Sequence, residues 1–450
     1  GASTTTPPAV LTPLAISPTA AATPKGNTAT TTASTQSTDW TTYHRDLTRT
    51  GSIANMPDPQ KLTLTWNTQL DGAVYAEPLV VGERVLVATE SNTLYALDRH
   101  TGQVQWHTTI ASPVTRSTLP CGNIDPLGIT GTPVYDPATS LLFAVAEVGG
   151  PAHILVGLDI NTGQVKVRRS VDPPGMDPLP HQQRAALTLF HGMVYIAFGG
   201  LYGDCGDYHG WVVASQTNGQ GSLLSYQVPT TREGGIWAVA GPAIDSAGKL
   251  YVSVGNGEAT GGNWDHSDSV LRLSPTLQLE DGFAPTQWGQ DNAGDSDLGS
   301  MAPVLLPDGT IFIVGKSGQA YTLHANVLGG VGGQIQQQYI CGSYGGAASE
   351  GSSVYVPCAN GIRLVQVGPD GGITSVWRAP ANVTSSPVVG GNTVYSLDPT
   401  GGTLYALNAQ TGAVRTSLSI GEASRFTSPT LSGTDIFVGT LSGVAAVRGS

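Results

Sequence analysis

The sequence predicts an all-β domain, an eight-bladed β-propeller, from three observations. A strand–turn–strand unit occurs twice almost letter for letter, as TLYALDRHTGQVQW at 93–106 and as TLYALNAQTGAVR at 403–415. Weaker copies recur between them at a period of roughly 40 to 60 residues, which is typical of propellers, at 154–168, 211–226, 269–280, 319–335 and 361–377. The 59 glycines, 30 prolines and only 12% charged residues suit many short strands joined by turns.

The two best copies also predict how one unit folds. Each starts with an apolar strand, continues into a polar Asx-x-x-Thr-Gly turn, and ends in a second short strand. The Asx and Thr side chains of such a turn bond their own backbone, and the glycine takes a positive φ, so the chain reverses into a hairpin. Four such strands would make one blade of the propeller.

The strand units also predict how the ring closes. Residues 62–70, LTLTWNTQL, alternate like a strand but have no partner next to them in sequence, whereas the last unit, 426–449, has three strands and lacks an outer one. We therefore expect 62–70 to complete the last blade, which removes an exposed sheet edge. Eight inner strands are expected, at 76–81, 131–135, 185–189, 241–244, 301–305, 346–349, 385–389 and 427–431.

Residues 1–38 differ sharply from the rest of the chain. They consist mostly of Thr, Ser, Ala and Pro, which bury too little apolar surface to fold, and we expect a disordered tether. The sequence begins at Gly1 without a methionine, and such a segment often follows a removed secretion signal. We expect an exported protein, secreted or held at the cell surface or in the periplasm, with a lipid anchor through the removed signal as an open alternative.

Charge and hydropathy exclude some partners. The chain has 32 acidic and 20 basic residues, a net charge of −12, and its lysines and arginines are scattered. Nucleic acid and anionic membrane surfaces are therefore poor partners. No run of 18 apolar residues occurs, so no transmembrane segment is predicted.

The lengths of the connections predict which end of the ring carries a site. The turns between first and second strands, and those between third and fourth strands, are short and lie at one end. The connections at the other end are long and carry nearly all the unusual residues, which favours that end for function.

All four cysteines are expected to be paired, as in other exported proteins. Cys341 precedes the inner strand of blade 6 and Cys358 ends the next strand, so a hairpin brings the two to the same end. Cys121 and Cys205 remain, on the facing loops of blades 2 and 3.

The repeat YALDxxTGxxxW resembles that of the quinoprotein propellers. This family includes alcohol dehydrogenases that use pyrroloquinoline quinone with calcium, and non-catalytic relatives such as the outer-membrane assembly propeller. The resemblance covers residues 39–450 and implies the eight-bladed fold, but many members bind no quinone.

Several motifs on the long-loop end resemble the catalytic branch, namely GIW, VGNG, GDCGDYHG, DNAGDSDLGS and VGKSG. The resemblance implies a tryptophan beneath the quinone, calcium ligands, a catalytic aspartate and cations that contact the quinone. In this chain these are Trp237; Asn256 with Asp204 or Asp207; Asp295 or Asp297; and Lys316 and His209. Calcium bound by oxygen ligands would polarise the quinone carbonyl, and the aspartate would take the substrate's hydroxyl proton.

Two departures keep other functions open. The segment LPCGNID carries the single Cys121 where the dehydrogenases have two adjacent cysteines, and no Cys-x-x-Cys-His haem motif occurs. An enzyme of this kind would act on a small alcohol or sugar and need a separate electron acceptor. The alternatives are a non-catalytic binding or scaffold propeller with a protein partner, and a carbohydrate-binding or carbohydrate-processing propeller that uses Trp264, Trp288, Tyr202 and Tyr208.

Overall fold

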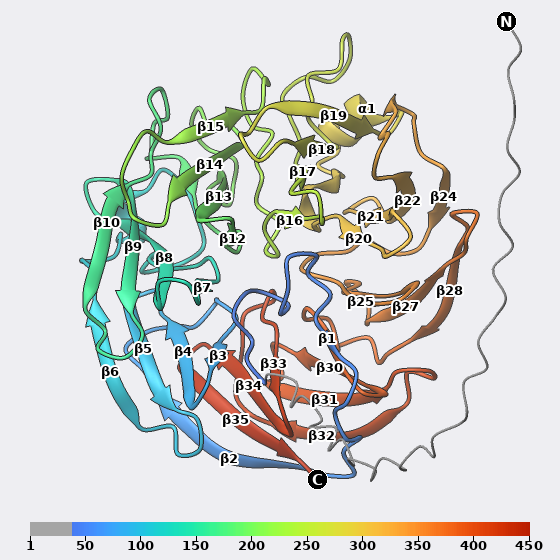
Figure 1. The fold of residues 1–450 in the computed structure, drawn as a ribbon. Coiled ribbons are helices and arrows are strands. Elements are labelled where there is room, and N and C mark those ends of the chain that lie inside the picture. The colour runs from blue at the N-terminus through green and yellow to red at the C-terminus, as the bar shows by residue number, and fades with distance from the viewer. Residues whose placement is uncertain (1–37) are drawn as a thin grey trace, which may run out of the picture. The chain divides into compact units, whose positions relative to one another are not determined.

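Eight small sheets follow one another around a ring in the computed structural model, which describes residues 38–450 (Figure 1). The predicted tether, residues 1–38, lies outside the described residues except for Thr38. Each sheet is one blade, and each predicted inner strand overlaps the first strand of a blade. The predicted eight-bladed propeller is therefore confirmed.

Blades 1 to 4 are formed from consecutive antiparallel strands, with β11 added to blade 3 and β23 paired in parallel with the outer strand of blade 4. Their strands are β3 Leu79–Val81, β4 Arg84–Ala88, β5 Thr93–Asp98 and β6 Val104–Thr109; β7 Val134–Asp136, β8 Leu141–Val148, β9 Ala152–Asp159 and β10 Val165–Ser170; β11 His181–Gln182, β12 Thr188–Phe190, β13 Met193–Gly200, β14 Trp211–Gln216 and β15 Leu224–Gln227; β16 Ala243–Ile244, β17 Leu250–Val254, β18 Ser269–Leu273, β19 Leu279–Ala284 and β23 Gly330–Val331.

Blades 5 to 8 repeat the arrangement, with β1 added in parallel to blade 7. Their strands are β20 Val304–Leu305, β21 Thr310–Val314, β22 Gln319–His324 and β24 Gln336–Tyr339; β25 Ala348–Glu350, β26 Ser353–Val356, β27 Arg363–Val367 and β28 Ile373–Arg378; β1 Ser52–Ile53, β29 Val388–Gly390, β30 Thr393–Asp398, β31 Thr403–Asn408 and β32 Val414–Ser419; β33 Thr430–Ser432, β34 Asp435–Thr440, β35 Gly443–Gly449 and β2 Leu62–Gln69.

Helices in the described residues are short: α1 Trp288–Ala293, and the 3-10 turns η1 Arg116–Thr118 and η2 Leu298–Ser300. Within that same region, no helix has the length and apolar character needed to span a bilayer.

The ring closes as predicted. β2 pairs antiparallel with β35, from Leu62 opposite Gly449 to Gln69 opposite Gly443, and so becomes the outer strand of blade 8. Both ends of the propeller thus share one sheet, which leaves no open blade.

Three tryptophans on outer strands fasten neighbouring blades. Each indole Nε1 donates a hydrogen bond to a backbone carbonyl of the next blade at 2.8–3.0 Å, and each ring lies against the glycine of that blade's Asx-x-x-Thr-Gly turn. The contacts are Trp66 with Arg99 and Gly102, Trp106 with Ile160 and Gly163, and Trp377 with Ala409 and Gly412. The same turn that makes the hairpin therefore also joins the blades.

The tryptophan contact can be tested by adding one methyl group. Gly412→Ala should lower the free energy of unfolding more than Gly82→Ala, because both glycines have a positive φ, +71° and +56°, but only the first Cβ meets a ring, 2.5 Å from Trp377 Cε3. The expected difference is about 1–3 kcal/mol, the usual cost of overpacking. Urea unfolding measures it, and equal losses in the two variants would show that the indole contact contributes nothing.

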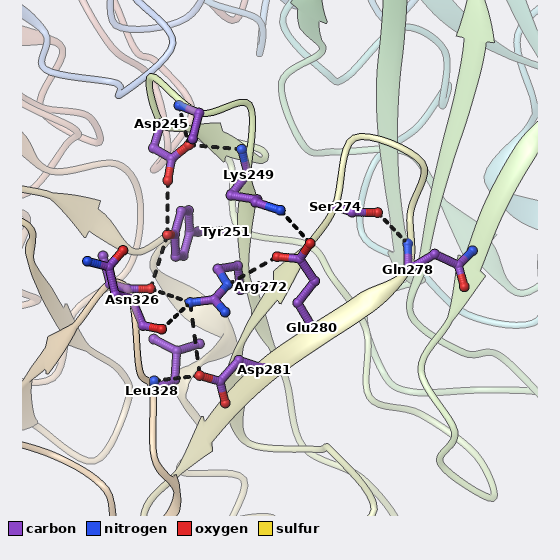
Figure 2. Close-up of polar contacts among 12 residues, drawn as sticks. Asp245, Lys249, Tyr251, Arg272, Ser274, Gln278, Glu280, Asp281, Asn326 and Leu328 are labelled. Atoms are coloured by element: carbon purple, nitrogen blue, oxygen red, sulfur yellow. Dashed lines mark hydrogen bonds and ion pairs between the residues drawn. The ribbon is translucent and has the colours of Figure 1, made fainter. Parts of the chain in front are cut away.

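A polar network joins blades 4 and 5 at the rim (Figure 2). Arg272 on β18 donates to the carbonyls of Ala325 and Asn326 at 2.7 and 2.8 Å, just after β22. Its Nε lies 3.4 Å from Glu280 Oε2, and Asp281 accepts a hydrogen bond from Leu328 N at 2.7 Å. The arginine therefore carries a charge-assisted link from one blade to the next.

The segment 39–53 crosses the middle of the ring, where Figure 1 shows it in blue. We call it the plug. Its backbone forms hydrogen bonds with the inner strands of five blades. Trp40 forms a β-bridge with Val80 of blade 1. The other four bonds run from strand N–H groups to plug carbonyls: Tyr135 to Thr41, Ile244 to Leu47, Ser349 to Thr50 and Val389 to Gly51. These bonds lie toward the ends of the inner strands that lead into the short turns. The plug therefore covers the axis at the short-turn end of the ring.

Two buried side chains hold the plug in place. The Arg49 guanidinium donates to five oxygens of the plug and of blades 3 and 4, namely Thr42 Oγ1 and the carbonyl of Tyr43, the carbonyl of Leu187, Thr188 Oγ1 and the carbonyl of Pro242. The two ring nitrogens of His44 lie 3.0 Å from the Ala347 carbonyl and 2.9 Å from Ser428 Oγ. Burial lowers the pKa of His44 to about 3, so its ring stays neutral.

Candidate functional site

A cavity of about 670 Å³ lies on the propeller axis at the long-loop end. Its walls come from the connections between blades and from those between second and third strands, as the positions of the strands show. Its charged, aromatic and amide lining residues include Tyr75, Arg184, Tyr202, Asp204, Tyr208, Trp237, Asn256, Asp295, Lys316, Tyr344, Arg425 and Phe426. The ring thus brings together side chains that are up to 366 residues apart, from Tyr75 to Leu441.

Five of the eight residues singled out from the sequence line this cavity: Asp204, Trp237, Asn256, Asp295 and Lys316. A sixth, Asp297, is buried directly behind Lys316. Asp207 and His209 do not line it. The Asp207 side chain is 78% exposed, and His209 Nε2 lies 3.5 Å from it rather than against the other site residues.

Lys316 stands at the centre of the cluster, in the connection between β21 and β22. Its Nζ lies 5.4 Å from the centre of the Trp237 ring and 2.9 Å from Asp297 Oδ1, and it also forms an ion pair with Asp295. Burial lowers the pKa of Lys316, but the charges of Asp297 and Asp295 outweigh it and leave the pKa raised. The ammonium group therefore keeps its charge against the indole face.

The two aspartates of the DSD sequence have different environments. Asp297 is fully buried, its Oδ2 accepts a hydrogen bond from Gly299 N at 2.9 Å, and burial raises its pKa while Lys316 opposes the rise. Asp295 lines the cavity, with a side chain that is 63% exposed. A molecule in the cavity can therefore reach Asp295, whereas Asp297 holds Lys316 from behind.

Gly255 allows the tryptophan and the buried aspartate to approach each other. A Cβ on this residue would lie 3.0 Å from Trp237 Nε1 and 3.3 Å from Asp297 Oδ2. Gly255 is therefore needed for the close packing of its backbone against Trp237 and Asp297.

Asn256 belongs to an acidic part of the wall. Its Nδ2 lies 3.3 Å from Glu233 Oε2, and Glu233 forms an ion pair with Arg232. Burial raises the pKa of Glu233, Arg232 lowers it, and the negative charges of Asp204 and Asp295 raise it further. Tyr208 donates a hydrogen bond to Asp204 Oδ1 at 2.6 Å. Oxygen donors thus converge here, although the described residues contain no group of three His, Cys, Asp or Glu placed to hold a metal ion.

The sequence interpretation missed Glu233 and the opposite wall. Glu233 lies in EGGIW, four residues before Trp237. Its backbone has a positive φ of 70°, which is uncommon for a residue other than glycine and could not be predicted from the sequence. On the other side, Arg184 and Arg425 lie against the ring of Phe426, with their Cζ atoms 5.0 and 6.0 Å from its centre. Two cations therefore face the cavity across from the acidic wall.

The aromatic residues suggested for carbohydrate binding do not form an exposed platform. Trp288 and Tyr208 are only 6% and 3% exposed, and the indole N–H of the half-buried Trp264 is bonded to the Ser267 carbonyl at 2.9 Å. Tyr202 alone of the four is exposed in the cavity.

Both predicted disulfides are confirmed. Cys121 pairs with Cys205 and Cys341 with Cys358, and the described residues contain no free cysteine. Cys205 directly follows Asp204, so the first bridge ties the loop that carries Asp204 and Tyr202 to blade 2.

A family profile for PQQ repeats, described as outer membrane protein assembly factor BamB, matches residues 58–177. The polyvinylalcohol dehydrogenase of Sphingopyxis sp. (strain 113P3) is 27% identical over 320 residues, which cover 60% of this chain and 45% of that protein. The chain therefore spans less than half the length of this curated relative.

Solved structures agree on the fold. The quinohemoprotein alcohol dehydrogenase from Comamonas testosteroni superposes with a TM-score of 0.72 at 16% identity, over 91% of this chain and 80% of that one. A europium-containing methanol dehydrogenase gives 0.69 at 16% identity, over 92% and 98% of the two chains. BamB from Moraxella catarrhalis gives 0.60 at 14% identity, over 87% and 100%.

The chain is an eight-bladed β-propeller in which residues 58–177 match the PQQ-repeat profile. Its structural relatives include both dehydrogenases and an assembly factor, so the fold alone does not decide its chemistry. The chemistry of this propeller therefore depends on the residues in its axial cavity.

Proposed function

We propose that this PQQ-like propeller is an exported dehydrogenase of alcohols or sugars that uses pyrroloquinoline quinone and calcium. The observation that carries the proposal is the meeting of Trp237, Lys316 and Asp295 in one axial cavity of about 670 Å³. The dehydrogenases among its relatives support the same class of reaction.

The residues present fit the cofactors. The Trp237 ring supplies a flat apolar face, and Lys316 and Arg184 supply positive charge for an anionic quinone. The amide oxygen of Asn256 and the carboxylates of Glu233 and Asp204 are the oxygen donors that calcium prefers. Calcium would have to draw these groups together, because the described residues hold no ready-made cluster of three acidic, His or Cys ligands.

The chain's own residues have separate roles in the proposed reaction. The bound quinone would supply the oxidising power, taking up two electrons and two protons as the alcohol becomes a carbonyl compound. Asp295 accepts the hydroxyl proton, because it is the aspartate that a substrate can reach. Lys316 keeps a positive charge in the cavity, and Asp297 holds it in position.

Export is part of the proposal. Two disulfides are typical of an oxidising compartment. No Cys-x-x-Cys-His motif occurs in the sequence, so a separate electron acceptor would be needed. Whether a lipid anchor holds the protein at the surface is a question for mass spectrometry of the native N-terminus.

Cofactor binding gives the direct test. Quinone with calcium should raise the melting temperature of the protein. At a ligand concentration 100 times the dissociation constant, binding adds about 2.7 kcal/mol to the free energy of unfolding. Asn256→Ala should weaken calcium and quinone together, because one oxygen ligand of a shared site is lost. Asn218→Ala, on an exposed turn of blade 3, is the matched control and should leave the shift unchanged.

The contrary result is equally clear. If quinone and calcium give no shift, and no alcohol or sugar in a broad panel reduces a dye, the enzyme reading fails. A non-catalytic binding propeller would then remain, a candidate that the profile match to the assembly factor favours. We do not advance carbohydrate binding through the four aromatic residues, because two of them are buried.

A further inference from the structure

A second, smaller cavity adjoins the axial one above blades 6 and 7. It measures about 250 Å³ and shares Tyr344, Ala423 and Arg425 with the axial cavity. We call it the side cavity. Its other lining residues come from the second-to-third-strand connections of blades 6 and 7 and the connection between these two blades: Pro357, Ala359, Thr384, Pro399 and Thr400. A ligand in the axial cavity therefore has room to extend sideways.

The side cavity differs from the axial cavity in having no acidic lining residue. Its lining contains one charged side chain, Arg425, whereas the axial cavity has Asp204 and Asp295 as well as the cations Arg184 and Lys316. Two threonine hydroxyls and apolar proline and alanine surfaces make up most of the rest. An anionic group in the side cavity would therefore meet the charge of Arg425 with no lining carboxylate to oppose it.

Arg425 is an exposed arginine whose guanidinium lies over an aromatic ring. Its Cζ lies 3.9 Å from the centre of the Tyr344 ring, so the ring supports the guanidinium. Among the described residues it forms neither a hydrogen bond nor an ion pair, although the chain has 32 acidic residues against 20 basic ones and Glu422 is three positions away. Five arginines pair with carboxylates, namely Arg99, Arg232, Arg272, Arg415 and Arg448. Four others among the described residues resemble Arg425 in having a side chain with neither a hydrogen bond nor an ion pair, namely Arg84, Arg184, Arg363 and Arg378, but none of these four lines the side cavity.

We propose that the side cavity is an anion subsite in which Arg425 binds a carboxylate of the substrate while the hydroxyl to be oxidised lies in the axial cavity. The planar guanidinium matches a carboxylate with two parallel hydrogen bonds, and stacking on Tyr344 holds it in place for them. The substrate class is a hydroxyalkanoate, with its two ends separated by an apolar chain that suits the proline and alanine surface. This inference rests on the proposed dehydrogenase function for the hydroxyl end alone.

Binding without reaction tests the subsite itself. Hexanoate, which has no hydroxyl group, should bind the quinone-free protein in a low-salt calorimetric titration, and 1-hexanol should not. Arg425→Gln should weaken hexanoate binding about tenfold or more, the usual loss for a charge-assisted bond. Arg425→Lys should keep part of the affinity. Arg168→Gln, on the exposed outer strand of blade 2, removes the same charge far from the cavity and should have no effect.

Kinetics with a matched pair of substrates tests the assignment to the substrate. With quinone and calcium bound, 6-hydroxyhexanoate and 1,6-hexanediol present the same carbon chain with and without a carboxylate. Arg425→Gln should raise KM for the hydroxyacid about tenfold, leave kcat nearly unchanged, and leave both constants for the diol unchanged. Hydroxyacids with chains of about four to eight carbons, roughly the range that a cavity of about 250 Å³ can accept, should be compared in the same way. Their kcat/KM should be highest at one chain length, the one that spans the distance between the two cavities.

The outcomes separate the two proposals. Hexanoate binding that depends on Arg425, without any alcohol oxidation, would end the dehydrogenase proposal and keep the subsite. Oxidation in which Arg425→Gln affects acid and diol alike would overturn the subsite and keep the enzyme. If Arg425→Gln instead weakens quinone binding, the arginine serves the carboxylates of the cofactor, and the assignment to the substrate is wrong.

Discussion

Asp295→Asn should lower kcat for quinone-dependent alcohol oxidation by about 10²–10⁴-fold, the usual contribution of a positioned general base. The amide keeps the size of the side chain but cannot take the hydroxyl proton. Because Asp295 is largely exposed, with 63% of its side chain accessible, the melting temperature should change little. Steady-state dye reduction with cofactor-saturated protein measures the effect.

Asp297→Asn separates the neighbouring aspartate from this role. Asp297 is buried and lies 2.9 Å from Lys316 Nζ, so its loss should loosen Lys316 and weaken quinone binding as well as reduce kcat. Asp207→Asn is the control, because that side chain lies outside the cavity lining, and it should retain full activity. If Asp295→Asn is active and only Asp297→Asn is dead, the buried aspartate is the base and our assignment is reversed.

Arg49→Met should lower the free energy of unfolding by about 3 kcal/mol or more. The substitution keeps an apolar stem but removes the donors for five oxygens that are buried between the plug and blades 3 and 4, and an unsatisfied buried polar group costs about 1–3 kcal/mol. It also removes the positive charge that partly offsets the burial of Glu77, whose pKa burial raises to about 8. Guanidinium unfolding followed by tryptophan fluorescence measures the loss.

The control for this experiment is Arg168→Met, an arginine exposed on the outer strand of blade 2. Its removal should change stability by less than about 0.5 kcal/mol, as is usual for surface substitutions. An Arg49→Met protein no less stable than this control would show that the plug is not held by its arginine.

The sequence alone was enough for the architecture and for some of the site. The copies at 93–106 and 403–415 set the strand and turn pattern of a blade, and the unpaired strand at 62–70 identified the partner of the last blade. Both disulfides were predicted, because a hairpin places Cys341 and Cys358 at one end and leaves only one other pair. These features depend on alternation and pairing between neighbouring segments, which a one-dimensional pattern records.

The tertiary structure decided what happens on the axis. The plug was not foreseen, since Arg49 finds its acceptors 138 and 193 residues away, at Leu187 and Pro242. The tertiary structure likewise decided which aspartate of the DSD sequence faces the cavity, that Arg425 lines it, and that Glu233 lies next to Asn256. The physical reason is that ring closure brings the loop ends of different blades to one axis, and no local spacing encodes which side chains meet there.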